Sequence, residues 1–163
     1  MAVPAPRVLY DDEGLQIAIW SRVFINRWRA VATLERLLVL GEHQRALVKA
    51  TGDQRIAVLT VLEDESGSMP SAPARKEAEA VAKSVRDAVI VQAQVVEGEG
   101  FVAASIRALL TGIALAIRAP YPNKVFKTVS EALPWVEEQL RKAGYADDAA
   151  GVTAAVHAVG PKA

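Results

Sequence analysis

Two acidic residues beside glycines in the middle of the chain are the first candidates for acid–base chemistry. Glu97 and Glu99 alternate with Gly98 and Gly100 directly before a long apolar segment. General acid–base catalysis needs groups placed to exchange a proton with a substrate, and no histidine or nucleophile accompanies these carboxylates. Acidic residues at a helix start stabilise the helix dipole, which favours a structural role. The glycine pair also lacks the third glycine and the lysine of phosphate-binding loops.

Metal and redox chemistry have even fewer candidates. The chain has two histidines, His43 and His157, and neither has a second possible ligand three or four positions away. It has no cysteine, which excludes a disulfide, a thiolate nucleophile and a cysteine metal site. The sequence therefore predicts no catalytic residue, no metal and no cofactor, and an enzyme of unrecognised type is the least favoured alternative.

The charges indicate which partners to expect. Nineteen basic and nineteen acidic residues give a net charge of zero, and nucleic-acid binding generally needs a positive excess or a basic face. Tryptophans and arginines do gather in residues 20–29, where a stacking surface for single-stranded nucleic acid is possible but a packed strand face is favoured. We expect no nucleic-acid partner. Between residues 100 and 130 all charged residues are basic, which predicts a patch for an anionic partner formed by Arg107, Arg118, Lys124 and Lys127.

The segment from 89 to 122 is the element that must position any site. Residues 89–96 are rich in β-branched side chains and predict a strand, residues 97–100 a turn, and residues 101–118 a helix. Because this helix is apolar on nearly all sides, we predict that it is a core element or an interface element. It is too short, and too interrupted by Arg107, to span a bilayer. Small residues recur at every fourth position, at Ala104, Ala108, Gly112 and Ala116, which allows close packing in the core or in a homodimer.

The remaining segments complete an α/β pattern. Residues 15–20 and 23–28 predict an antiparallel hairpin, and residues 56–62 a strand buried on both faces. Helices are predicted over residues 31–50, 74–88 and 132–143, with a last short strand over 121–127. Alternating strands and helices imply a mixed, mostly parallel sheet, here with five strands in the element order ββαβαβαβα.

One domain is predicted over residues 1–145. Residues 1–10 are expected to be a loose lead-in, and residues 146–163 an alanine-rich C-terminal tail that possibly contains a short helix. The N-terminus lacks the apolar stretch of a signal peptide, so we expect a cytoplasmic protein. The longest polar break, residues 63–73, is the candidate interaction loop because functional residues concentrate in such loops.

This arrangement resembles the STAS domain, the fold of the anti-sigma-factor antagonists, over residues 15–144. Residues 124–127 and 130–136 are similar to the closing strand and tryptophan-containing helix of STAS-like proteins. Asp64, Glu65, Ser66 and Gly67 stand where the antagonists carry Asp-Ser-Ser-Gly, with Glu65 in place of one serine. The resemblance implies a regulatory loop formed by Asp64, Ser66, Gly67 and Ser68, in which an added phosphate would change partner binding.

The function predicted first is therefore a non-catalytic, STAS-like regulatory module that binds a protein partner, with a homodimer possible. The alternative is a carrier or sensor of a lipid-like or other apolar small ligand. In that case the helix at 101–117 and the final helix, at 132–143, would line the pocket.

Overall fold

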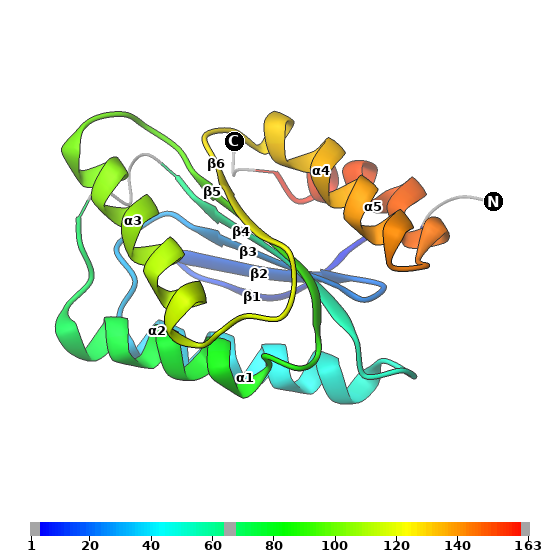
Figure 1. Ribbon diagram of the computed structural model, residues 1–163, viewed down its shortest axis with the longest axis horizontal. Helices are drawn as coiled ribbons and strands as arrows, with labels where there is room; N and C mark the ends of the chain where they lie inside the picture. Colours follow the sequence, from blue (N-terminus) through cyan, green and yellow to red (C-terminus); the bar gives the residue numbers. More distant parts are fainter. Residues whose placement is uncertain (1–3, 64–67, 161–163) are drawn as a thin grey trace.

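The computed structural model describes residues 4–63 and 68–160, which form an α/β protein around a mixed six-stranded sheet (Figure 1). The strands follow one another across the sheet in chain order: β1 Arg7–Asp11, β2 Leu15–Trp20, β3 Val23–Trp28, β4 Ile56–Leu62, β5 Val89–Val96 and β6 Asn123–Phe126. The pairs β1–β2 and β2–β3 are antiparallel, and β3 to β6 are parallel. The predicted α/β class and N-terminal hairpin are thus present.

Five helices cover the sheet within the described residues: α1 Leu34–Ala50, α2 Ala72–Ser84, α3 Phe101–Ala116, α4 Val129–Lys142 and α5 Ala146–Ala158. Helices α1, α2 and α3 each connect two neighbouring parallel strands. Because such crossovers share one handedness, all three lie on the same face. Helices α4 and α5 pack on the opposite face (Figure 1).

The alternation of side chains along the strands divides the core in two. On β5, Val91, Ala93 and Val95 point toward α4 and α5 and are fully buried. The residues between them, Gln92 and Gln94, point to the other face, where α2 and α3 lie. The two faces of this strand therefore have very different chemistry.

Side-chain caps fix where three of the helices begin. The hydroxyl oxygens of Thr33, Ser71 and Thr128 accept hydrogen bonds from the backbone N–H three residues ahead, at 3.1–3.2 Å. Each cap satisfies a backbone donor that the first helical turn leaves free. Ser71 therefore holds the end of the 63–73 loop against the start of α2.

The sheet has six strands, so the predicted count of five was wrong. The additional strand, β1, lies in the segment expected to be a loose lead-in, and it pairs with β2 with a bulge between Val8 and Tyr10. As an edge strand it buries little, which leaves no clear hydrophobic alternation for a pattern to detect. The indole Nε1 of Trp20 donates to the carbonyl of Pro4 at 2.9 Å and secures the chain just before this strand.

Helix α3 is not the fully covered element that its composition predicts. Phe101 is 86% exposed and Leu115 74% exposed, and within the helix only Ala103 and Ile106 are buried. Helix α3 is therefore not a core helix of this chain, because overall hydrophobicity does not specify which neighbours cover a helix, and an interface role for it stays a prediction. The small residues of the predicted ridge are also exposed, and a Cβ added to Gly112 would meet no atom within 4 Å.

The C-terminal segment contributes a complete helix to the core. Helix α5 packs against α4 and buries side chains facing the sheet, namely Ala149, Val152, Ala155 and Val156. They join the same hydrophobic cluster as the inner face of β5. Residues 146–158 are thus part of the folded domain.

Candidate functional site

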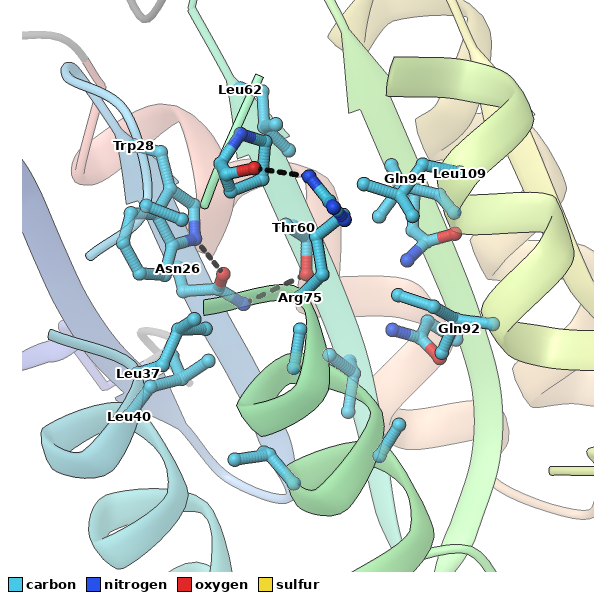
Figure 2. Close-up of a pocket in the computed structure, with 18 of the residues that line it drawn as sticks. Asn26, Trp28, Leu37, Leu40, Thr60, Leu62, Arg75, Gln92, Gln94 and Leu109 are labelled. Atoms are coloured by element: carbon cyan, nitrogen blue, oxygen red, sulfur yellow. Dashed lines mark hydrogen bonds between the residues drawn. The ribbon is translucent and has the colours of Figure 1, made fainter. Parts of the chain in front are cut away.

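The chain forms a pocket between the sheet and the three helices α1, α2 and α3 (Figure 2). Its volume is about 130 Å³. An engineered cavity of about 150 Å³ binds benzene, so this pocket is close to the size that holds a single ring.

The walls of the pocket are apolar. Helix α1 contributes Leu37 and Leu40 from one side. The remaining wall comes from small and branched side chains of α2 and α3. They include Ala74, Ala78, Val81, Ala82, Ile106, Leu109, Leu110, Ile113 and Ala114. Helix α3 packs on the sheet through Ala103 and Ile106, whereas Leu109, Leu110 and Ile113 line the pocket and stay only half-buried.

The floor comes from four adjacent strands and combines apolar side chains with a row of polar ones. Asn26 on β3 lies beside Thr60 on β4, and Thr60 lies beside Gln94 on β5. Gln92, two residues earlier on β5, lies beside Asn123 on β6. A row of amides and a hydroxyl therefore crosses the sheet beneath an apolar roof, which is the composition of many small-molecule sites.

At the β3 end of the row the polar groups are already paired. The Asn26 side-chain Nδ2 donates to the Leu59 carbonyl at 3.2 Å and to Thr60 Oγ1 at 3.0 Å. Its Oδ1 accepts from Trp28 Nε1 at 2.8 Å (Figure 2). These bonds fix the orientation of the Trp28 ring, and Asn26 Oδ1 already accepts a hydrogen bond. The β3 end of the row therefore has a structural role.

A second pair closes the floor near β6. Tyr121 is buried beside the pocket, and its hydroxyl donates to Gln92 Oε1 at 3.1 Å. Burial raises the pKa of Tyr121, and the nearby Arg86 only partly offsets this effect. The phenol consequently stays protonated at neutral pH and remains a hydrogen-bond donor.

Two further amide oxygens of the floor have no hydrogen-bond partner among the described residues. Gln94 Oε1 and Asn123 Oδ1 are both shielded from solvent, and Gln94 as a whole is only 7% exposed. A buried acceptor without a donor costs about 1–3 kcal/mol relative to a paired one. Buried acceptors of this kind are commonly satisfied by an ordered water or another bound molecule.

One charged residue, Arg75 of α2, is found among the described residues that line the pocket. Its Nη1 donates to the carbonyl of Pro70 at 2.7 Å and so joins α2 to the preceding loop (Figure 2). Ser68 and Pro70 of that loop also line the pocket, and Ser68 is exposed. The end of the loop therefore lies where the pocket meets solvent.

This placement bears on the predicted regulatory loop. Ser68 borders the pocket, whereas Asp64, Ser66 and Gly67 lie outside the described residues. The final helix does not line the pocket, contrary to the expectation for an apolar carrier, because α4 lies on the opposite face of the sheet. Helices α1 and α2 take the place that was expected for it.

The four basic residues predicted as one patch have different surroundings. Arg107 Nη2 donates to the carbonyls of Val96 and Gly98 at 2.8 and 2.7 Å, so it is committed to the turn before α3. Arg118 lies beyond the far end of α3, which ends roughly 14 Å from Arg107 along the helix. Lys124 and Lys127 are exposed at β6, with Lys124 Nζ 5.3 Å from the centre of the Phe126 ring.

The other candidates from the sequence do not form a site. Trp20, Trp28 and Arg27 are buried, so they offer no stacking surface. His43 and His157 lie on α1 and α5, which cover opposite faces of the sheet. Within residues 4–63 and 68–160, no three histidine, aspartate or glutamate side chains come together as a possible metal site.

The polar floor was missed when the sequence was interpreted, although a signal was present. In residues 89–96 the glutamines stand at alternate positions, 92 and 94, within an otherwise apolar strand. A spacing of two places both side chains on one face of a strand. Paired with Asn26 and Thr60 in the neighbouring apolar runs, this pattern indicates a polar stripe on a buried sheet face.

Neither a protein-family model nor a curated protein nor a solved structure matches this chain. The STAS resemblance therefore stays a prediction from sequence motifs. In the described part of the chain, no helix is long and apolar enough to cross a membrane.

Proposed function

We propose that this protein binds a small, predominantly apolar organic molecule in the pocket and acts as a non-catalytic carrier or sensor. The observation that carries the proposal is the pocket itself, with apolar walls above a floor of buried amides. The exposure of α3 supports it, because a molecule in the pocket would cover the half-buried side chains on the inner face of this helix.

Blocking the pocket tests the proposal. Ala114 lines the pocket from α3, so Ala114→Phe should fill the space and abolish binding. Ala108 lies on the same helix and is exposed, which makes Ala108→Phe the matched control. Native mass spectrometry of the gently purified proteins would report any retained molecule as a mass excess. We expect the excess in the wild type and in Ala108→Phe but not in Ala114→Phe, and equal retention by both variants would place the ligand elsewhere.

A regulatory module that binds a protein partner through residues 63–73 is the second candidate. What favours it is the position of Ser68 and Pro70 at the pocket, because a bound molecule would contact the end of this loop. Pocket occupancy would then change the surface offered to a partner. The loop should respond to a ligand, and hydrogen exchange measures that response directly.

A further inference from the structure

The described lining of the pocket combines hydrogen-bond donors with one positively charged side chain, that of Arg75. We infer that the pocket selects a small organic acid with an apolar body of about one ring. Its carboxylate is bound by Arg75 and by the side-chain N–H groups of Gln92 and Gln94. This inference rests on the proposed binding function and adds the chemical class of the ligand. It excludes cations and molecules that lack a hydrogen-bond acceptor.

The glutamines of the floor present their N–H groups to the pocket. Gln94 Oε1 is shielded from solvent, so a molecule in the pocket does not reach this oxygen. Gln92 Oε1 accepts the hydrogen bond from Tyr121, which leaves Gln92 Nε2 as the free end of that amide. In Figure 2 the side-chain nitrogens of both glutamines point toward the side of the pocket where Arg75 lies, and neither forms a hydrogen bond with the residues shown. An amide nitrogen only donates, so the groups that match it are acceptors.

Arg75 adds a charged donor with one edge available. Its Nη1 donates to the Pro70 carbonyl at 2.7 Å, whereas its Nε and Nη2 form no hydrogen bond with the described residues. These two nitrogens lie on one edge of the planar guanidinium, and such an edge matches the two oxygens of a carboxylate. No aspartate or glutamate is among the described lining residues, and none of the ion pairs within residues 4–63 and 68–160 includes Arg75.

The surroundings of Arg75 suit an anion. Its side chain is half-buried, and it is bonded to Pro70 in the loop where the pocket meets solvent. Partial burial strengthens a charge-assisted hydrogen bond, and the remaining contact with water lowers the cost of desolvating a carboxylate. A cation, by contrast, would face Arg75 and the amide N–H groups without a counter-ion among the described lining residues.

The rest of the ligand must be apolar and small. Leu109, Leu110 and Ile113 of α3 line the pocket and are half-buried, so a ring placed against them would remove apolar surface from water. The volume of about 130 Å³ is close to that of a cavity that holds benzene. A carboxylate on a single ring, as in benzoate, therefore matches both the charged and the apolar parts of the lining.

Benzoate and benzamide provide a matched pair of probes. They have the same ring and nearly the same shape, but benzamide is neutral and carries an NH₂ group in place of one carboxylate oxygen. The resonances of Trp28, which lines the pocket, report both titrations by NMR. At pH 7 we expect the wild type to bind benzoate about tenfold more tightly than benzamide, the factor of one charge-assisted hydrogen bond. Acetate, which lacks the ring, should bind at least about tenfold more weakly than benzoate.

A pair of substitutions on α2 tests the charge. Arg75→Gln should reduce the preference for benzoate to about twofold or less, because the charged edge is lost. The affinity for benzamide should change little, which shows that the pocket is intact. Lys76 is the next residue of the helix, is exposed and does not line the pocket. Lys76→Gln removes the same charge from the protein and should keep the tenfold preference.

A second pair tests the floor. Gln94→Met keeps the length of the side chain but removes its N–H donors, and it should weaken benzoate binding by about threefold or more. Gln139 is a half-buried glutamine of α4 on the other face of the sheet, and Gln139→Met should leave the affinity unchanged. An unchanged affinity in Gln94→Met as well would contradict the role of the floor.

The outcomes separate the ligand class from the pocket function. Equal binding of benzoate and benzamide to the wild type, or a full preference retained in Arg75→Gln, would overturn the acid class while the pocket function stands. A preference lost equally in Lys76→Gln would mean that net charge attracts the anion without a contact to Arg75. Acetate bound as tightly as benzoate would overturn the ring-sized body. Failure of benzoate to bind at millimolar concentration would overturn the acid class, and the native mass spectra of the wild type and Ala114→Phe decide the pocket function separately.

Discussion

Asp12 shows how a single residue organises the N-terminal turn. Its Oδ1 accepts hydrogen bonds from the backbone N–H groups of Gly14 and Leu15, at 2.7 and 2.8 Å. Its Oδ2 accepts from the Tyr10 hydroxyl and from Arg36 Nε of α1. A Cβ on Gly14 would come within 2.5 Å of the Arg36 guanidinium carbon, so a larger residue there would make the end of the Arg36 side chain shift. The turn thereby anchors β1 and β2 to α1.

The carboxylate should make stability depend on pH. Partial burial opposes its ionisation, but the hydrogen bonds from Tyr10, Gly14, Leu15 and Arg36 outweigh burial and lower the pKa of Asp12 to about 2. The folded-state pKa is below the unfolded value, so the stabilisation is present above about pH 4 and is lost as pH falls toward 2. Because the side chain is 31% exposed, solvent screening limits the effect to about 1 kcal/mol.

Asp12→Asn tests this expectation. Urea unfolding at pH 7 should give a free energy of unfolding lower by about 1 kcal/mol, and the difference from the wild type should shrink as pH approaches 2. Glu13→Gln, at the exposed neighbouring position, should change stability by less than about 0.5 kcal/mol. A difference that is constant from pH 7 to pH 2 would mean that charge is not the cause.

At the residue scale, contacts between residues close together in the sequence are easier to predict than contacts that depend on tertiary packing. The caps at Thr33 and Thr128 involve partners three residues away, so both depend only on local sequence. The state of the free oxygens of Gln94 and Asn123 depends instead on which helix covers them and how closely. No local pattern contains that information.

Among the elements, α3 is the helix whose solvent exposure agrees least with its apolar composition. It is held by a small cluster in which Val96, Ala103 and Ile106 are buried, while its ends remain exposed. Periodicity and the glycine turn predicted its limits well, since these depend on its own sequence. Its poor coverage could not be predicted, because the gap beside it arises from the spacing of α2 and α3 over the sheet.

A ligand in the pocket should therefore stabilise α3 more than other helices. Hydrogen exchange of residues 101–116 and 68–75 should slow when a small aromatic probe such as indole is added. If these amides exchange only when the unbound site opens, a probe concentration ten times the dissociation constant should slow exchange about tenfold. Helix α5, on the far face, serves as the internal control and should change far less. Uniform slowing across all helices would indicate global stabilisation without a contact to α3. Unchanged exchange at residues 68–71 would show that the loop does not respond to a molecule in the pocket.

At the scale of the whole molecule, a cluster of polar contacts joins the two ends of the chain. Arg22, in the turn between β2 and β3, pairs with Asp53 at 2.7 Å and with Asp148 of α5 at 3.0 Å, and its guanidinium lies 4.1 Å from the centre of the Tyr145 ring. The hydrogen bond from Tyr145, with those from Arg22 and the Arg55 backbone, lowers the pKa of Asp53 to about 2 despite some opposing burial. The start of α5 is thus fixed to the sheet.

The alternation of strands and helices predicted the parallel half of the sheet, in which β4 and β5 are strongly apolar runs. It did not predict β1 or the docking of α5. Both elements bury only a narrow set of side chains, and in α5 those side chains are mostly alanine and valine, so the contrast between its faces is weak. Their places are decided by surfaces that the rest of the fold leaves uncovered.

The contribution of α5 to the domain can be measured with one pair of substitutions. Val152 is fully buried against the sheet, so Val152→Ala removes two methyl groups from the core and should lower the free energy of unfolding by about 2 kcal/mol. His157 lies on the same helix and is exposed, and His157→Ala should change it by less than about 0.5 kcal/mol. Urea unfolding with an unchanged m-value would confirm that both variants unfold as one unit. If α5 were a loosely attached tail, the two substitutions would have equally small effects, because neither side chain would be part of the core that unfolds cooperatively.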